Sequence, residues 1–162
     1  MGNPLHKGQQ YTLSISNGWK DLQGLPLHQS YSKKFIVVGR DSTSPEPELW
    51  MLHLPEEGTD QPLRVSFKEP LDYFLISETI SIVDEKGTHI PGKIKVINHE
   101  TGFDFFPYKQ WQPGRYRLQA ASQLEDLAGN NLNKLFDRDI QLKQSNTDKE
   151  FAEKEFIIGG VR

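Results

Sequence analysis

The chain has 162 residues, of which 25% are charged and 35% are hydrophobic, and it carries a formal net charge of −3. These proportions are typical of a folded globular protein and not of a disordered chain. Lysines and arginines are scattered, so the basic runs that mark nucleic-acid binding are missing, and no apolar run reaches the roughly 20 residues that span a bilayer. We therefore expect neither a nucleic-acid partner nor a membrane span.

The chain contains no cysteine, which excludes thiol nucleophiles, disulfides and cysteine-based metal sites. Ten prolines and 13 glycines are spread along its length, a composition that predicts many short strands joined by turns. The opening stretch "MGNPLHKGQQ" lacks the apolar region of a signal peptide, so a secreted parent would require this chain to be a mature fragment.

The first expected elements, in residues 1–38, are two strands that alternate apolar and polar positions, as strands with one buried face do. The apolar positions are Tyr11, Leu13 and Ile15, then Tyr31, Phe35 and Val37. In the turn between them, "KDLQGLPL", Asp21 is suited to accept backbone N–H groups and Gly24 to supply a positive φ. A lone hairpin is marginal in water, and leaving its apolar face wet would cost of order 10 kcal/mol. We therefore expect self-association through this hairpin or its edge strands, or cover from neighbouring modules of the parent protein.

Residues 39–47 are polar and proline-bearing, which predicts a linker. From there to residue 143, short alternating segments follow one another between glycines and prolines, the pattern of an antiparallel β-sandwich of about seven strands. The strands are expected within residues 49–54, 63–67, 79–83, 93–97, 103–106, 116–120 and 136–142. The stretch "EPLDYFLISE" is less strand-like and is expected to cross between sheets with a short helical turn.

Two parts of the chain repeat each other. The stretch "YTLSISNGWKDLQGLPL" from Tyr11 aligns with "YRLQAASQLEDLAGNNL" from Tyr116, and the spacing from tyrosine to glycine is the same in both. Extending the alignment at the same offset places Tyr31, Phe35 and Val37 over Phe136, Ile140 and Leu142. Self-similarity of this kind indicates repeated modules, so residues 1–38 are expected to be the C-terminal hairpin of an incomplete second copy.

The complete copy resembles the bacterial immunoglobulin-like (Ig-like) repeat of S-layer proteins. The residues that carry the resemblance are Phe67, Glu69, Pro70, Leu71 and Asp72; Asp84 and Gly87; Trp111, Pro113, Gly114 and Tyr116; and Asp126, Gly129, Asn130 and Leu132. Trp111 departs from the family pattern, which has leucine there, and the glycine-to-tyrosine spacing is one residue shorter. The resemblance covers residues 46–143 as a whole module, whereas residues 3–38 resemble only the last third of one. It implies an Ig-like sandwich in a bacterial surface or secreted protein, in which such modules serve as spacers, adhesive repeats or accessory domains.

The second Asp-x-x-Gly loop admits two interpretations. In the structural one, Asp126 and Gly129 hold the turn as Asp21 and Gly24 do, while Leu127 and Leu132 tuck under the sandwich. In the other, the loop oxygens bind calcium; the candidate ligands are Asp126, Asn130, Asn131 and Glu125. The first copy has Lys20, Leu25 and Pro26 where Glu125, Asn130 and Asn131 stand. It therefore lacks those ligands, which favours the structural interpretation and the expectation of no cofactor.

Other candidate sites have simpler explanations. Trp19, Trp50 and Trp111, with Phe106 and Tyr108, could form an exposed aromatic platform for sugars, although core packing accounts for such residues more often. Glu69 and Asp72 could be paired carboxylates for glycoside hydrolysis, but a strand-end cap and turn is the favoured interpretation. The five histidines, His6, His28, His53, His89 and His99, show no metal-binding spacing, and exposed turn positions are favoured over a zinc site.

The C-terminal residues 144–162 are expected to be a charged tail, either disordered or carrying a short strand in "EFIIGGV". That strand would begin a following unit or cover an edge. No catalytic constellation is recognised in the sequence, so the expected function is that of a non-enzymatic structural or adhesive module, secreted or at the bacterial cell surface. The alternative is a carbohydrate- or peptide-binding accessory domain of a secreted enzyme.

Overall fold

The computed structural model describes residues 4–39, 41–133 and 150–160. The chain divides into two compact units, Met1–Asp41 and Ser42–Arg162, which are called the first and the second unit below. Every strand pair in the described residues is antiparallel, which confirms the predicted all-β antiparallel fold.

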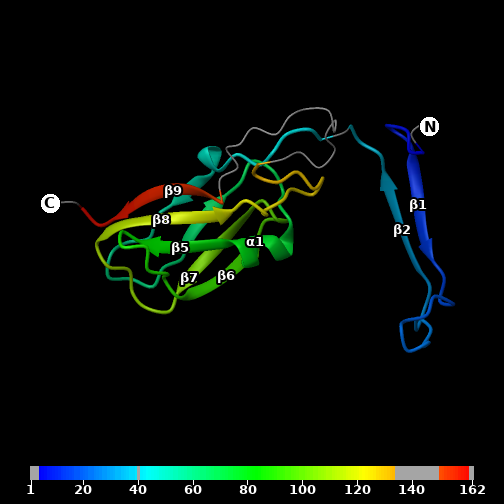
Figure 1. Ribbon diagram of the computed structural model, residues 1–162, viewed down its shortest axis with the longest axis horizontal. Coiled ribbons are helices and arrows are strands. Elements are labelled where there is room, and N and C mark those ends of the chain that lie inside the picture. The colour runs from blue at the N-terminus through cyan, green and yellow to red at the C-terminus, as the bar shows by residue number, and fades with distance from the viewer. Residues whose placement is uncertain (1–3, 40, 134–149, 161–162) are drawn as a thin grey trace. The chain divides into compact units, whose positions relative to one another are not determined.

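The second unit is a sandwich of two sheets (Figure 1). One sheet has the order β3-β4-β7-β6, with β3 Met51–His53, β4 Leu63–Ser66, β7 Gly102–Pro107 and β6 Gly92–Ile97. The other has the order β5-β8-β9, with β5 Ile80–Asp84, β8 Gly114–Ala121 and β9 Phe151–Ile158. Lettered A to G in chain order, these strands give sheets ABED and CFG, the arrangement of a seven-stranded Ig-like sandwich.

The core lies between the two sheets and follows from the alternation in the sequence. Leu63 and Val65 of β4 are fully buried, as are Phe103 of β7 and Leu118 of β8. Polar residues occupy the positions between them and turn outward, because successive side chains of a strand point to opposite faces. Trp111, which precedes β8, fills the gap between the aromatic residues of both sheets.

Two short helical elements accompany the sheets, and the second of them connects one sheet to the other. The 3₁₀ helix η1 (Pro47–Leu49) leads into β3, and α1 (Tyr73–Thr79) lies between β4 and β5. Asp72 caps α1 because its side chain accepts N–H bonds from Phe74 and Leu75, both at 2.9 Å. The expected helical crossing after residue 69 is therefore present, and Asp72 serves as its cap.

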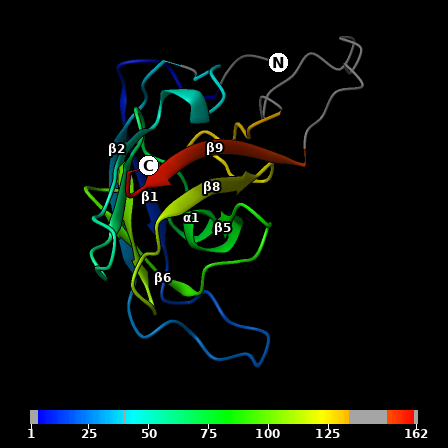
Figure 2. The ribbon, with the colours of Figure 1, turned by 90° about the vertical axis from the view of Figure 1, so that its left-hand side faces the viewer.

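The strand that closes the second sheet lies in the C-terminal segment. Residues 136–142, where a strand was expected, lie outside the described residues; the strand paired with β8 is β9, formed by "FAEKEFII". The pairing runs from Gly114↔Ile158 to Ala121↔Phe151, and Figures 1 and 2 both show β9 alongside β8. The sandwich thus extends beyond residue 143, and the strand expected within the tail is its closing strand.

The first unit is a single hairpin in its described residues. Its strands are β1 (Gln10–Ile15) and β2 (Tyr31–Ile36), paired in register from Gln10↔Ile36 to Ile15↔Tyr31. A long connection joins them and contains an isolated bridge between Lys20 and Pro26. Large apolar side chains of this unit are exposed to solvent; that of Leu13, for example, is 50% exposed.

Within the described ranges, neither helix has the length and apolar character needed to cross a bilayer.

Candidate functional site

The two repeated loops have the same backbone geometry. In the first unit, Oδ1 of Asp21 accepts N–H bonds from Gln23 (3.0 Å) and Leu25 (2.9 Å). In the second, Oδ1 of Asp126 accepts N–H bonds from Ala128 (2.7 Å) and Asn130 (2.9 Å). These donors stand two and four residues after the aspartate in both loops, so each carboxylate holds its own turn.

Both loops also need a glycine at the same place. Gly24 and Gly129 each have a φ of +83°, and each donates its N–H to the carbonyl of the aspartate three residues earlier. A residue with a Cβ is disfavoured at such a φ, which explains the spacing Asp-x-x-Gly. The loop residues Asp21, Gly24, Asp126 and Gly129 therefore all stabilise the turns.

The same turn occurs a third time, after β5. Oδ1 of Asp84 accepts N–H bonds from Lys86 (2.9 Å) and Thr88 (2.8 Å), and Gly87 has a φ of +80°. The hydrogen bond from Thr88 is the main reason that the pKa of Asp84 lies below its usual value. Sequence reasoning treated this loop only as part of a family pattern, although the Asp-x-x-Gly spacing was visible. Because the turn is a local solution used in different places, its recurrence alone does not establish repeated modules.

Two of the calcium candidates, Asp126 and Asn130, are hydrogen-bonded to each other within the loop. Besides the two bonds to Oδ1, Oδ2 of Asp126 accepts a hydrogen bond from the side-chain amide of Asn130 at 2.8 Å. Both residues are buried, and a carboxylate oxygen of Glu69 lies within 4.8 Å of one from Asp126. This arrangement accounts for Asp126 and Asn130 as a hydrogen-bonded pair that fixes the loop.

One detail of the expected loop is wrong. Leu127 was expected to tuck under the sandwich, but it is 69% exposed, and the equivalent Leu22 of the first unit is fully exposed. Leu124, which precedes the loop, is buried instead, and Leu132 packs against the core. The residue after each aspartate points outward because the side chain and backbone of the aspartate occupy the inside of the turn.

The tyrosine that opens each copy ties down the chain before it. The hydroxyl of Tyr116 donates to the carbonyl of Gln112 at 2.8 Å, an arrangement found at the start of strand F in Ig-like domains. In the first unit, the hydroxyl of Tyr11 accepts the N–H of His6 at 3.0 Å. Burial is the main reason that the pKa of Tyr116 is raised above its usual value. Both hydroxyls thus bind backbone groups of the segment that precedes their strand.

The three tryptophans do not form a common platform. Trp50 and Trp111 are only 3% and 2% exposed and belong to the core of the second unit, where Nε1 of Trp111 donates to the carbonyl of Gln61 at 2.9 Å. Trp19 is 68% exposed and lies in the first unit. Core packing, the alternative in the sequence analysis, thus describes Trp50 and Trp111.

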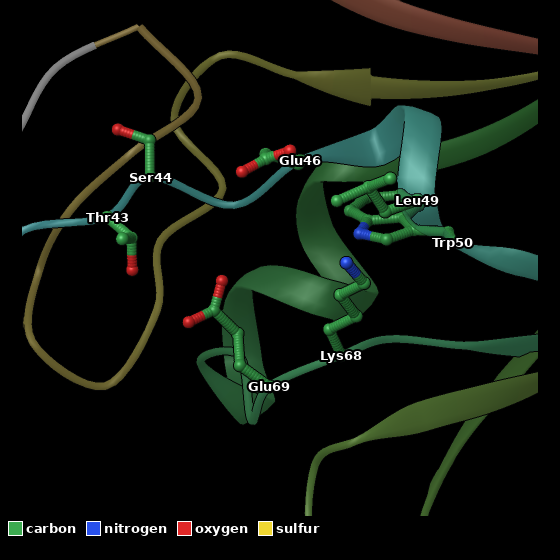
Figure 3. Close-up of a pocket in the computed structure, with 7 residues that line it drawn as sticks. All are labelled: Thr43, Ser44, Glu46, Leu49, Trp50, Lys68 and Glu69. Carbon is green, nitrogen blue, oxygen red and sulfur yellow. The ribbon is translucent and has the colours of Figure 1, made fainter.

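A small pocket opens beside Trp50 in the second unit (Figure 3). Its volume is about 240 Å³, and its lining residues are Thr43, Ser44, Glu46, Leu49, Trp50, Lys68 and Glu69. Figure 3 shows the carboxylates of Glu46 and Glu69 and the ammonium group of Lys68 around one hollow, with the indole of Trp50 at its side. The pocket combines hydrogen-bonding groups of both charges with apolar surface from Leu49 and Trp50, a combination that can bind a small polar ligand.

The remaining candidates stay apart from one another. All five histidines are exposed, and within the described parts of the chain none belongs to a cluster that could hold a metal ion. An ion pair joins Arg64 to Asp104 with hydrogen bonds of 2.6 and 2.8 Å, and it bridges β4 and β7 on the outer face of their sheet. The hydrogen bonding of the Arg64 guanidinium to the carboxylate of Asp104 is the main reason that the pKa of Arg64 is raised above its usual value.

Comparisons of the chain with protein-family models, with curated proteins and with solved structures found no match.

Proposed function

We propose that the chain is a non-enzymatic structural module of a bacterial cell-surface or secreted protein, in which Ig-like units follow one another. The observation that carries this proposal is the recurrence of one strand pair in both units. Tyr11 pairs with Phe35 in the first unit, and Tyr116 pairs with Phe156 in the second. Ig-like sandwiches support many unrelated functions, so the proposal rests on what the polar side chains do and not on the fold.

The aspartates of the three loops and of the α1 cap have structural tasks. Asp21, Asp84 and Asp126 hold turns, and Asp72 caps α1. A catalytic site needs a nucleophile, base and orienting group that converge on one reacting atom. These aspartates each serve their own segment of chain, which supports a structural role.

A structural module should bear load as one cooperative unit. Pulling the full chain by its ends in single-molecule force spectroscopy should give one discrete unfolding step, in which the part from β3 to β9 is released. Its extension should be about 3.3–3.6 Å for each residue freed, less the folded length. Gradual extension without a step would contradict the proposal, whereas ligand-dependent steps would favour a binding role.

The pocket beside Trp50 favours a second candidate function, the binding of a saccharide or peptide as an accessory domain. Its lining residues include the hydroxyl-bearing Thr43 and Ser44, the carboxylates of Glu46 and Glu69 and the ammonium group of Lys68. A glycan array and a peptide array probed with the full chain test this function. Binding that is lost in Glu46→Gln and kept in Glu155→Gln, a change at an exposed position of β9, would establish it. Absence of binding on both arrays would leave the structural role.

A further inference from the structure

The β1–β2 hairpin matches the β8–β9 pair residue by residue. The rings of Tyr11 and Phe35 stack at 6.0 Å with an interplanar angle of 24°, and those of Tyr116 and Phe156 stack at 5.5 Å and 18°. Each pair consists of directly opposite residues in its ladder. The hairpin therefore corresponds to strands F and G of an Ig-like sandwich.

The match continues along both ladders. Two positions further on, Leu13 faces Lys33 in the first unit, and Leu118 faces Lys154 in the second. Directly opposite residues of an antiparallel ladder point to the same face of the sheet. Leu13 and Lys33 therefore share one face with Tyr11 and Phe35, which is called the inner face below.

The inner faces of the two pairs differ in exposure. Leu118 of the second unit is fully buried and Phe156 is 6% exposed, whereas Leu13 and Phe35 of the first unit are 50% and 36% exposed. The edges differ as well, because β8 pairs with both β5 and β9, whereas β1 pairs only with β2 in the described residues. The first unit thus presents both a face and an edge that are occupied in its counterpart.

The second unit shows which chemistry covers such a face. Its β8–β9 pair lies against the β3-β4-β7-β6 sheet, whose inward residues, Leu63 and Phe103 among them, share its core. The ammonium group of Lys154 at the rim donates to the backbone carbonyl of Glu48 in η1, at 2.7 Å. A partner for the hairpin must therefore offer aliphatic and aromatic side chains with a carbonyl acceptor opposite Lys33.

We propose that the inner face of β1–β2 docks the apolar face of a four-stranded antiparallel sheet of the β3-β4-β7-β6 kind, supplied by polypeptide outside this sequence. A strand equivalent to β5 pairs with the free edge of β1 in the same complex. A second copy of the hairpin fits less well, because face-to-face packing would bury two Lys33 ammonium groups against apolar side chains without acceptors.

The test supplies the missing sheet from this chain itself. A duplicate of residues 48–112, which contain β3 to β7, is fused ahead of residue 6 of the full chain, and amide hydrogen exchange is compared with that of the unextended chain. The amides of β1 and β2 should exchange about 100-fold more slowly in the fusion, because their opening then requires a sandwich to unfold. Unchanged exchange in the fusion overturns the proposal.

Two matched variants of the fusion report on the face. Leu13→Asp lies on the inner face and should abolish the added protection, whereas Ser14→Asp lies on the outer face of the same strand and should preserve it. Equal effects of the two changes overturn the proposal.

Sedimentation of the unextended chain at micromolar concentration supplies an independent measurement. A monomer is expected, and a dimer that Leu13→Asp disperses but Ser14→Asp does not would identify a second copy as the occupant and overturn the proposal. Neither outcome bears on the structural role of the second unit, which its cooperative unfolding under load tests separately.

Discussion

At the scale of single residues, the aspartates of the three loops act as substitutes for missing backbone partners. A tight connection leaves N–H groups without strand partners, and a carboxylate oxygen two to four residues earlier satisfies two of them at once. Asp126 is the most engaged of these residues, because its second oxygen also holds Asn130. Its energetic role is therefore larger than that of a solvated surface carboxylate.

Replacing Asp126 tests this role. Asp126→Ala leaves two backbone N–H groups without acceptors, one of them on buried Asn130, and should lower the free energy of unfolding of the second unit by about 1–3 kcal/mol. Asp126→Asn keeps Oδ1 as an acceptor and should cost less. Urea denaturation measures both. Equal, negligible losses would show that the loop does not depend on this side chain.

Calcium should leave the protein unchanged if Asp126 and Asn130 form a structural pair. The melting temperature should be the same with excess calcium and with a chelator, because a ligand that binds only the folded state raises the stability by mass action. A rise in melting temperature with calcium that Asp126→Asn removes would instead establish a metal site in this loop.

Gly102 shows how closely the sheet strands approach each other. A Cβ at this position would collide with the backbone carbonyl of Val65, which cannot move aside as a flexible side chain can. Gly102→Ala should therefore cost about 1–3 kcal/mol of stability. Gly160→Ala is the matched control, since open space surrounds Gly160, and it should stay within about 0.5 kcal/mol. Similar effects of the two changes in a thermal melt would contradict this packing.

At the scale of elements, period-two alternation predicted most strands because one buried face determines both their existence and their register. It worked for β4 and β8, where Leu63 and Leu118 point inward between polar neighbours. The strand predicted within residues 136–142, from extending the repeat at a fixed offset, lies outside the described residues and stays a prediction, whereas the strand that pairs with β8 is β9. The better signal was local, since "KKFIV" and "EKEFII" share the phenylalanine that faces each tyrosine.

The candidate sites were less predictable because exposure depends on tertiary packing. In the sequence, Trp50 and Trp19 are equally plausible as ligand-binding aromatic residues. In the structure, Trp50 lies in the core and Trp19 is exposed to solvent. The loop aspartates were predictable because their hydrogen bonds are local in sequence. The pocket beside Trp50 could not be predicted from the sequence, because residues from two separate segments, 43–50 and 68–69, form it.

The role of β9 can be tested by truncating one inward side chain. Phe156 is buried against Trp111 and Tyr116, so Phe156→Ala should lower the stability by about 3–5 kcal/mol. The neighbouring Ile157 is partly exposed on the other face, and Ile157→Ala should cost at most about 1 kcal/mol. Equal, small losses in urea denaturation would mean that β9 is a tail and not the closing strand.

The depressed pKa of Asp84 gives the turn after β5 a pH dependence. A carboxyl group with a lower pKa in the folded state stabilises the fold above its unfolded pKa, near 3.9, and loses that contribution as the pH falls through the folded pKa. The melting temperature should therefore fall less on acidification from pH 5 to about pH 2 in Asp84→Asn than in the unmodified protein. Parallel pH profiles of the two proteins would contradict this cause.

At the scale of the whole molecule, the same strand pair occurs once as part of a complete sandwich, in the second unit, and once as a hairpin, in the first. In the second unit, the pair belongs to the β5-β8-β9 sheet, and its inward side chains share one core with the β3-β4-β7-β6 sheet. In the first, the pair is a hairpin with an open inner face, and isolated hairpins are only marginally stable in water. Stability should therefore be distributed very unevenly along the chain.

Amide hydrogen exchange of the full chain, resolved by strand, tests this account most directly. We expect the amides of β8 and β9 to exchange only through global unfolding of the sandwich. The amides of β1 and β2 should exchange through local opening, orders of magnitude faster. Protection of β1–β2 equal to that of β8–β9, or exchange of β9 as fast as that of an unfolded tail, would contradict the equivalence of the two pairs.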